Sequence, residues 1–389
     1  MRRIRVVRVV HHLVRGGGVQ TRLTELLPRL ADEVDVRVLC YRKRGELADV
    51  LERSGIPVDW IPRGAKWSPV NLCTYARYFR RHRPDVVHTH SYTANTMAIV
   101  AARLAGVPVR IRHIHTLIPW GREGRLRTAL RVRVDRWAAR IADVTLAVSG
   151  AARERFLAGV GLPPGSCRVL YNGIDLARFR GARAEGASIR QELGIPPEAP
   201  VAGVVGRLAR GKGHLDFLRA ARAVARSEPR ARFLVVGEGP MRAELEETAR
   251  ELGLGERVLF TGYRGDIPAL LGSMDVFVFP GRPDEEGRIP DGLPGVVIEA
   301  QAAGLPVVSS DLPMIPEMLP PGDGVGRIVP AGNAGALAEG IVGFFRARAG
   351  ESGVRARTVR NAERFSLERC ARQTLDLYGE LLAKRGRSP

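Results

Sequence analysis

Short runs rich in valine and isoleucine alternate along the chain with longer segments in which apolar residues recur at helical spacing. Strand-length apolar runs that alternate with amphipathic helices are typical of βαβ units and parallel sheets. One series of predicted strands spans 4–10, 34–40, 85–88, 107–113 and 143–149, and a second spans 200–206, 231–237, 257–262, 275–280 and 305–311. We therefore expect an α/β protein with two doubly wound domains of similar size.

The polar stretch between the two series predicts where the domains divide. Residues 181–198 combine glycine, alanine and proline with charged side chains, as linkers do. The expected organisation is a Rossmann-like domain over 1–180, this linker, a second Rossmann-like domain over 199–365 and a final helix within 366–389. A length of 389 residues suits two domains.

Composition excludes several classes of protein. With 45% hydrophobic and 26% charged residues, the chain has a globular rather than a disordered composition. The four cysteines lie far apart without metal-ligand spacing, which predicts free thiols in a reducing compartment. Neither a signal segment nor an apolar run long enough to span a membrane is visible, since Arg103 interrupts the best candidate. We expect a cytoplasmic protein.

The net charge of +20 predicts attraction to polyanions. Residues 121–140 carry seven arginines and residues 75–83 carry four more, with apolar residues between the charges. Both stretches resemble amphipathic basic helices, which suit either a solvated face or the inner surface of an anionic membrane. No recognised nucleic-acid motif accompanies them, so nucleic acid is not an expected partner.

The stretch "GRLARGKGH" at 206–214 nearly matches a phosphate-binding P-loop. Gly213 occupies the position where the P-loop has the hydroxyl that binds magnesium, and the strand at 231–237 ends without a magnesium-binding acid. A P-loop ATPase is therefore disfavoured. A helix that begins near Gly213 can still bind phosphate at its N-terminus, with Arg207 and Lys212 beside it. The alternative is a solvated lysine at a turn.

A second candidate site lies in "DGLPGVVIEAQAAGLPVVSSD", residues 291–311. A glycine- and proline-rich turn at 292–295 leads into a predicted helix, with Asp291 before the turn and Glu299 inside the helix. Two such carboxylates can accept hydrogen bonds from sugar hydroxyls, while the amides of the turn face a diphosphate. Taken singly, each acid fits a capping or solvated position equally well.

Four histidines fall in pairs at the ends of two predicted strands. His88 with His90, and His113 with His115, are two residues apart, so each pair points to one face and can in principle bind zinc. No cysteine or carboxylate lies nearby at ligand spacing. No metal site is predicted.

In this order, the motifs of the chain resemble those of the family 4 retaining glycosyltransferases, which have the GT-B fold of two facing Rossmann-like domains. Besides the two stretches already quoted, the matching elements are "GGGVQTRL" at 16–23, "HTH" at 88–90, "RHIHT" at 112–116, "YNGID" at 171–175, "VVGEGP" at 235–240 and "FTGYRGDIPALL" at 260–271. Each is weak alone, but together they cover nearly the whole chain. The resemblance implies that the final helix packs back onto the first domain.

The resemblance also implies roles for individual residues. Arg207 and Lys212 would bind the donor diphosphate and stabilise the charge on the leaving nucleotide, Glu299 would bind the ribose, and Asp291 would orient the donor sugar. The implied catalytic set is Arg207, Lys212, Asp291 and His115, which matches the family's histidine near the reacting sugar. The remaining implied donor-binding residues are Gly17, Gly18, Tyr263, Arg264, Gly292, Leu293, Pro294 and Gly295.

Two residues depart from the family pattern. Asp291 is one methylene shorter than the usual glutamate, which leaves the choice of donor sugar open, and Gln20 replaces the acid that commonly ends the first glycine-rich loop. Glu285 and Glu286 lie nearby, but they are not in register with the motif and so do not replace the glutamate that the family commonly has at the position of Asp291.

The expected activity is the metal-independent, retaining transfer of a hexose from a nucleotide-diphosphate sugar to a lipid-linked, glycolipid or polysaccharide acceptor. No cofactor is expected. The donor nucleotide, UDP, GDP or ADP, is not specified by these residues. The alternatives on the same architecture are a nucleotide-sugar epimerase or a sugar phosphorylase, and from another class a non-catalytic nucleotide-binding scaffold at a membrane.

Overall fold

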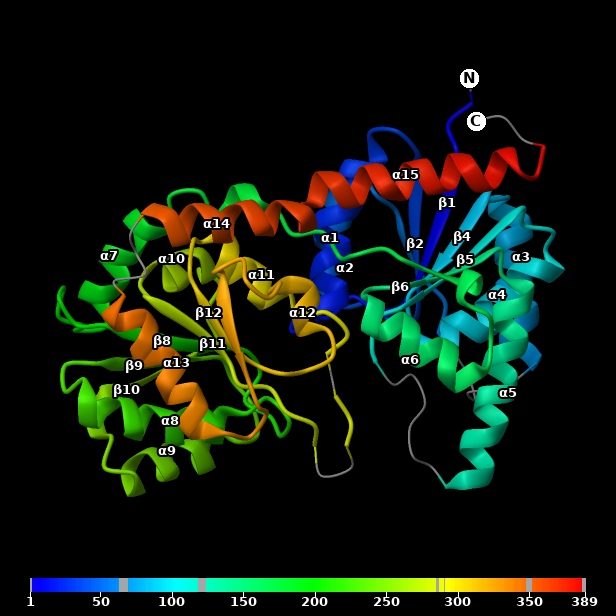
Figure 1. Ribbon diagram of the computed structural model, residues 1–389. Helices are drawn as coiled ribbons and strands as arrows, with labels where there is room; N and C mark the ends of the chain where they lie inside the picture. Colours follow the sequence, from blue (N-terminus) through cyan, green and yellow to red (C-terminus); the bar gives the residue numbers. More distant parts are fainter. Residues whose placement is uncertain are drawn as a thin grey trace. The chain divides into compact units, whose positions relative to one another are not determined.

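The computed structural model describes residues 2–62, 69–117, 124–284, 287–289, 291–347 and 352–386. They form two compact units, each built around one parallel sheet (Figure 1). The first unit consists of Met1–Gly173, Asp291–Leu293 and Leu367–Pro389, and the second of Ile174–Pro290 and Pro294–Ser366. Both sheets follow the doubly wound α/β pattern that the alternation of strands and helices predicted.

The first unit holds a sheet of seven strands in the order β3-β2-β1-β4-β5-β6-β7. The strands are β1 (Arg5–His12), β2 (Asp35–Lys43), β3 (Val58–Trp60), β4 (Val86–Thr89), β5 (Val109–Ile114), β6 (Val144–Ala147) and β7 (Cys167–Val169). The helices are α1 (Gly18–Ala31), α2 (Leu47–Arg53), α3 (Pro69–His82), α4 (Ile99–Leu104), α5 (Arg125–Ile141), α6 (Gly150–Val160) and α15 (Leu367–Ala383), with a π-helical turn at Ala94–Ala98.

The second unit holds a sheet of six strands in the order β10-β9-β8-β11-β12-β13. The strands are β8 (Val201–Val205), β9 (Arg232–Val236), β10 (Val258–Gly262), β11 (Val276–Phe279), β12 (Val307–Ser310) and β13 (Gly326–Val329). The helices are α7 (Ala182–Glu192), α8 (His214–Ser227), α9 (Arg242–Glu251), α10 (Ile267–Gly272), α11 (Gly295–Ala302), α12 (Ile315–Met318), α13 (Ala334–Arg346) and α14 (Ser352–Ala362).

Each sheet reverses its strand order at one point. In the first sheet the chain builds outward from β1 to β3 and then continues from β4 on the other side of β1. In the second sheet β8 and β11 are the corresponding neighbours. Ligands of doubly wound folds bind at the carboxyl ends of the strands beside such a switch point. The loops after β1, β4, β8 and β11 are therefore the expected ligand-binding loops.

Helix α15 belongs to the core of the first unit, although it comes last in the chain. Leu367, Cys370, Leu377, Tyr378 and further apolar side chains of α15 are buried in the same cluster as residues of β1, β2 and α1. Figure 1 shows α15 beside α1, and the two helices are in contact. A separate apolar cluster covers the opposite face of this sheet, with side chains from α3 and α4.

The segment expected as a linker, 181–198, is instead largely helical. Helix α7 packs so closely on α10 that a Cβ atom on Gly272 would lie 1.7 Å from the carbonyl oxygen of Ala182. A Cβ on Gly186 would likewise lie 2.2 Å from the carbonyl carbon of Gly272. The small residues that resembled linker composition thus permit contact between two helices.

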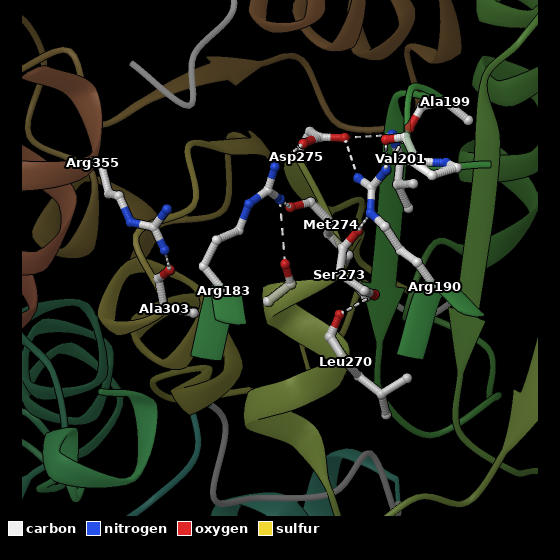
Figure 2. Close-up of polar contacts among 12 residues, drawn as sticks. Arg183, Arg190, Ala199, Val201, Leu270, Ser273, Met274, Asp275, Ala303 and Arg355 are labelled. Carbon is white, nitrogen blue, oxygen red and sulfur yellow. Dashed lines mark hydrogen bonds and ion pairs between the residues drawn. The ribbon is translucent and has the colours of Figure 1, made fainter. Parts of the chain in front are cut away.

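Two arginines of α7 strengthen this packing by capping α10 (Figure 2). Arg183 donates to the carbonyl oxygen of Gly272, the last residue of α10, at 3.3 Å, and Arg190 donates to that of the C-cap residue, Ser273, at 2.9 Å. Both guanidinium groups also pair with Asp275. The last carbonyls of a helix lack partners within the helix and face its negative dipole end, so arginines are favourable there. Helix α7 is therefore an integral part of the second unit.

Among the described residues, no helix combines the length and the apolar character needed to cross a membrane.

Candidate functional site

The loop after β8 is fixed by its neighbours in the second unit. Leu208 is fully buried, its N–H donates to the carbonyl of Glu238 at 2.9 Å, and its own carbonyl accepts from the N–H of Met241 at 3.1 Å. These bonds join the loop after β8 to the loop after β9. Arg207, next in sequence, has an exposed side chain. Arg207, which was predicted to bind the diphosphate, therefore has its exposed side chain next to a main chain that is fixed by the hydrogen bonds of Leu208.

Glycine at 213 is required by a close contact with the loop after β11. Gly213 precedes α8 with φ +76°, and a Cβ atom there would lie 1.7 Å from the carbonyl oxygen of Pro280. The carbonyl of Gly211 accepts from the N–H of Arg282 at 3.0 Å. Lys212 is half-buried between these two glycines. As predicted, a helix begins directly after Gly213, and its N-terminus lies at the switch point of the sheet.

A cavity of about 590 Å³ adjoins this loop within the second unit. Its lining includes Arg207, Arg210, Arg282 and Arg288, together with the first residue of α8, His214. Of the predicted site residues, only Arg207 is among the lining residues. The cavity therefore places three further arginines next to the predicted phosphate loop, and the sequence did not single them out. Arg210 comes from the loop after β8, and Arg282 and Arg288 come from the segment after β11.

His214 and Asp216 are the buried polar groups at the start of α8. Asp216 accepts from Arg282 at 3.3 Å and from Arg219 at 3.1 Å, which holds Arg282 against the helix. Within the described residues neither ring nitrogen of His214 has a hydrogen-bond partner. Burial, helped by the charge of Lys212, lowers the pKa of His214 to about 4. His214 is therefore neutral near pH 7.

The turn before α11 contributes a second helix N-terminus to the second unit. Helix α11 begins at Gly295, and its N-cap residue, Pro294, offers no capping side chain. Glu299 lies one turn into the helix and is half-buried, between fully buried neighbours. Asp291, Gly292 and Leu293 are grouped with the first unit by their contacts, whereas Gly295 and Glu299 belong to the second unit.

The structure gives Tyr263 and Arg264 different environments. Tyr263 is 64% exposed after β10, which suits a side chain available for stacking on a base. Arg264 pairs with Asp266 at 2.6 Å and with Glu192 of α7 at 2.5 Å. These contacts raise the pKa of Arg264 above its usual value. Its predicted part in base recognition thus competes with a structural ion pair between α7 and α10.

In the first unit, the glycine-rich loop follows β1. Gly17 is the N-cap of α1 and Gly18 is its first residue, while Gly16 has φ +88°. Gln20, which replaces the acid of the family pattern, is half-buried, and its Nε2 lies 3.5 Å from Nδ1 of His12. The loop therefore places a helix N-terminus and a neutral amide at the switch point of the first sheet.

Four histidines in and directly after β4 and β5 form one cluster at the same end of the first sheet, in which His88, His90 and His113 are buried and His115 is partly exposed. Nδ1 of His90 lies 3.0 Å from Nε2 of His115, and Nε2 of His88 lies 3.3 Å from Nδ1 of His113. The rings of His88 and His90 stack with their centroids 4.5 Å apart. The two pairs, each of which was expected to point to one face, therefore meet in one cluster, with His88, His90 and His113 in the interior.

Arg8 of β1 completes the cluster and was not selected from the sequence. Its side chain is 1% exposed, its Nη1 lies 2.9 Å from Nε2 of His90, and its guanidinium lies over the ring of Tyr378 at 5.7 Å. Burial and the charge of Arg8 lower the pKa of His115 to about 3. The sequence signal was present: an arginine in the middle of a central parallel strand, whose faces are both buried.

Three histidines of the cluster have the spacing of a metal site. Ligand atoms of His88, His90 and His113 lie within 4.8 Å of one another. The guanidinium beside His90, however, is a buried positive charge that opposes a dication and already occupies the Nε2 atom of His90. The donor set therefore fits a metal poorly.

Comparison with known proteins agrees with this architecture. Residues 16–178 match the family described as Glycosyltransferase Family 4, and residues 199–346 match Glycosyl transferases group 1. The putative glycosyltransferase EpsF of Bacillus subtilis is 30% identical over 78% of this chain and 79% of its own. An Escherichia coli enzyme named UDP-Gal:alpha-D-GlcNAc-diphosphoundecaprenol alpha-1,3-galactosyltransferase is 29% identical over 74% of each chain.

Solved structures show the same fold. Anabaena HepE, crystallised with UDP, superposes with a TM-score of 0.82 at 22% identity over 96% of this chain and 99% of its own. A glycosyltransferase from Rickettsia africae gives 0.83 at 18% identity over 98% and 99%. The fold is thus the α/β GT-B fold, with two Rossmann-like units. The chain belongs to the group 1 glycosyltransferases of family 4 type, as its motifs predicted.

Proposed function

We propose that this glycosyltransferase transfers a hexose, with retention of anomeric configuration and without a metal, from a nucleotide-diphosphate sugar to a lipid-linked, glycolipid or polysaccharide acceptor. The observation that carries the proposal is the basic loop after β8, held rigidly at the switch point where doubly wound folds bind ligands. The named activity of the Escherichia coli relative, a galactosyl transfer to a lipid diphosphate, supports the acceptor class.

The proposed donor site combines cationic side chains with helix N-termini. Arg207 and Lys212 bind the diphosphate together with the N-termini of α8 and α11, and the positive charges stabilise the departing nucleotide. Glu299 accepts hydrogen bonds from the ribose hydroxyls. This arrangement supplies charge neutralisation without a metal ion, which is why we propose that none is needed.

On the sugar side, Asp291 and the turn from Gly292 to Gly295 orient the donor sugar, and His115 donates a hydrogen bond to one of its hydroxyls. Gly17 and Gly18 allow the main chain of the first loop to approach donor and acceptor. Since burial keeps the pKa of His115 at about 3, it is neutral and serves as a hydrogen-bond partner rather than a proton carrier.

Calorimetric titration of the intact protein with UDP, GDP and ADP, first in EDTA and then with magnesium, tests the donor site. We expect one diphosphate to bind equally well in both conditions, and Lys212→Ala to weaken its binding at least about tenfold, as for loss of a charged hydrogen bond. Lys384→Ala is the matched control, because Lys384 is an exposed lysine paired with Glu380 on α15. Binding that requires magnesium would refute the metal-independent site.

Turnover distinguishes the remaining activities. Transfer requires an acceptor, epimerisation proceeds without one, and a scaffold releases no nucleoside diphosphate from the donor. The anomeric configuration of the product, read by NMR, tests retention directly, and an inverted product would contradict it.

We further propose that α5 docks on an anionic membrane from the inner side, which would place the enzyme peripherally in the cytoplasm. Leu126, Leu130, Arg133, Trp137 and Arg140 recur at helical spacing, so they share one stripe of α5. All five are exposed, including Leu126 at 85%. An apolar and cationic stripe is the pattern that binds anionic lipid surfaces.

Sedimentation with phosphatidylglycerol vesicles at low salt tests this docking. Wild type should sediment with the anionic vesicles and not with phosphatidylcholine vesicles, and a Leu130→Ser, Trp137→Ser double variant should lose binding. Leu104→Ser is the control, since Leu104 is an exposed leucine on α4, 55% accessible, outside this stripe. Equal sedimentation of the double variant and the control would refute the assignment to α5.

A further inference from the structure

The contact between Arg8 and His90 fixes where the protons of two histidines lie. A guanidinium only donates hydrogen bonds, so Nη1 of Arg8 is the donor at 2.9 Å and Nε2 of His90 carries no proton. A neutral histidine with a bare Nε2 is protonated on Nδ1. His90 therefore donates from Nδ1 in its other contact.

The second contact passes this constraint to His115. Nδ1–H of His90 faces Nε2 of His115 at 3.0 Å, so Nε2 of His115 is the acceptor. The remaining proton of neutral His115 then lies on Nδ1. Within the described residues this buried Nδ1 has no hydrogen-bond partner. His115 thus holds a donor N–H of fixed tautomer that is not used by the protein around it.

We propose that Arg8 is a positioning residue: acting through His90, it holds His115 in the Nδ1–H tautomer and so makes this N–H the group that His115 offers to the substrate. The tautomer follows from the contacts alone. Only the last step, donation to a sugar hydroxyl, rests on the proposed function.

Arg8 occupies a position that stability alone would not favour. It is 1% exposed, and among the described residues its Nε and Nη2 atoms have no hydrogen-bond partners. The other fully buried arginine of this sheet, Arg112 of β5, is instead paired with the equally buried Asp135 of α5. Replacing even a paired buried charge, together with its partner, by apolar side chains of similar volume is often neutral or stabilising. The role of Arg8 is therefore best sought in what its charge does to His90 and His115.

The other pair of histidines provides an internal control. Nδ1 of His88 lies 3.0 Å from the hydroxyl of Tyr378, which can donate or accept, so this contact fixes no tautomer. Tyr378→Phe removes that hydroxyl and keeps the aromatic ring beside Arg8. It should leave the tautomer of His115 unchanged.

¹⁵N NMR of the histidine-labelled full chain tests the proposal, because protonated and bare ring nitrogens have well-separated shifts. The His115 signals are assigned by their loss in His115→Phe. Wild type, Tyr378→Phe and Arg8→Lys, which keeps an obligate donor, should all show Nδ1–H. Arg8→Met should show a mixture with Nε2–H, while its urea midpoint is no lower than that of wild type. Its turnover should fall about 100-fold, as for loss of one aligned donor.

A wild-type His115 protonated on Nε2, or an Arg8→Met variant that keeps the pure Nδ1–H form, would overturn the proposal. A shifted tautomer with unchanged turnover would refute the step to the substrate. If the wild type shows Nδ1–H but transfers no sugar from any donor, the proposed function fails and the role of Arg8 in fixing the tautomer stands.

Discussion

Replacing Gly213 by alanine should destabilise the second unit and weaken donor binding together. Gly213 has φ +76°, and an alanine in this left-handed region costs roughly 1–2 kcal/mol. Its Cβ would also lie 1.7 Å from the carbonyl oxygen of Pro280, so one of the two loops must move. Overpacking of this kind typically costs about 1–3 kcal/mol. Together we expect the free energy of unfolding to fall by about 2–5 kcal/mol.

The assay can separate the two units because of where the tryptophans lie. Trp60, Trp67, Trp120 and Trp137 all fall within 1–173, so tryptophan fluorescence follows the first unit alone. Circular dichroism follows the helices of both units. In urea, Gly213→Ala should lower the midpoint of a transition seen by circular dichroism and leave the fluorescence transition unchanged. Calorimetry should show weaker binding of the nucleoside diphosphate, because Lys212 moves with the loop.

Gly206→Ala is the matched control in the same loop. A Cβ on Gly206 meets no atom within 4 Å, and this residue has no left-handed φ. Such a substitution at a compatible position is expected to be neutral or to stabilise by about 0.4–1 kcal/mol. If Gly213→Ala unfolds like Gly206→Ala, or if the fluorescence transition shifts instead, the close contact with Pro280 does not constrain this loop.

Three further perturbations have definite expected outcomes. Asp135→Ala leaves Arg112 as an unpaired buried charge and should lower the fluorescence-detected stability of the first unit by about 3–5 kcal/mol, whereas an unchanged urea midpoint would contradict a buried pair. If Arg264 acts only through its ion pairs, Arg264→Ala and Glu192→Ala should both leave calorimetric donor affinity unchanged, and selective loss of affinity in Arg264→Ala would restore a part in base recognition. Acid should destabilise the first unit. The pKa of histidine is about 6.5 in the unfolded chain, whereas that of folded His115 is about 3, so the unfolded state binds more protons between these values. The free energy of unfolding therefore falls as the pH drops through this window, by up to about 1.4 kcal/mol per pH unit for each such histidine. A fluorescence-detected urea midpoint that is equal at pH 7 and pH 5 would contradict the buried neutral cluster.

The sequence was most informative where strands are buried on both faces. All ten predicted strands are present, and most of them are valine- and isoleucine-rich runs buried within a sheet. The exception is β10, an edge strand with partly exposed residues. The strands it missed, β3, β7 and β13, lie at sheet edges and include polar or partly exposed residues. Helix α7 was missed for a related reason: its glycine and alanine positions are contact surfaces, which composition does not distinguish from a flexible segment.

The motifs of the candidate site could be located from the sequence, but the ion pairs that its charged side chains form could not. The position of α8 after Gly213 followed from the loop pattern alone. The ion pair of Arg264 with Glu192 joins segments far apart in sequence, so no local sequence pattern predicts it. Arg8 was hidden by composition, since one arginine among 61 basic residues carries little weight until its strand is known to be buried on both faces. The individual donor roles of the site residues remain predictions.

The place of α15 in the first unit has a consequence for how the protein is made. A ribosome releases β1 to β7 first, but the sheet then lacks Leu377, Tyr378 and the other side chains that cover one of its faces. Those residues arrive only after the entire second unit has emerged. Until then, the segment that forms β1 to β7 leaves apolar surface exposed to solvent, and nascent proteins in this state aggregate or recruit chaperones. A fragment ending at Gly173 should accordingly be insoluble unless the α15 segment is supplied with it.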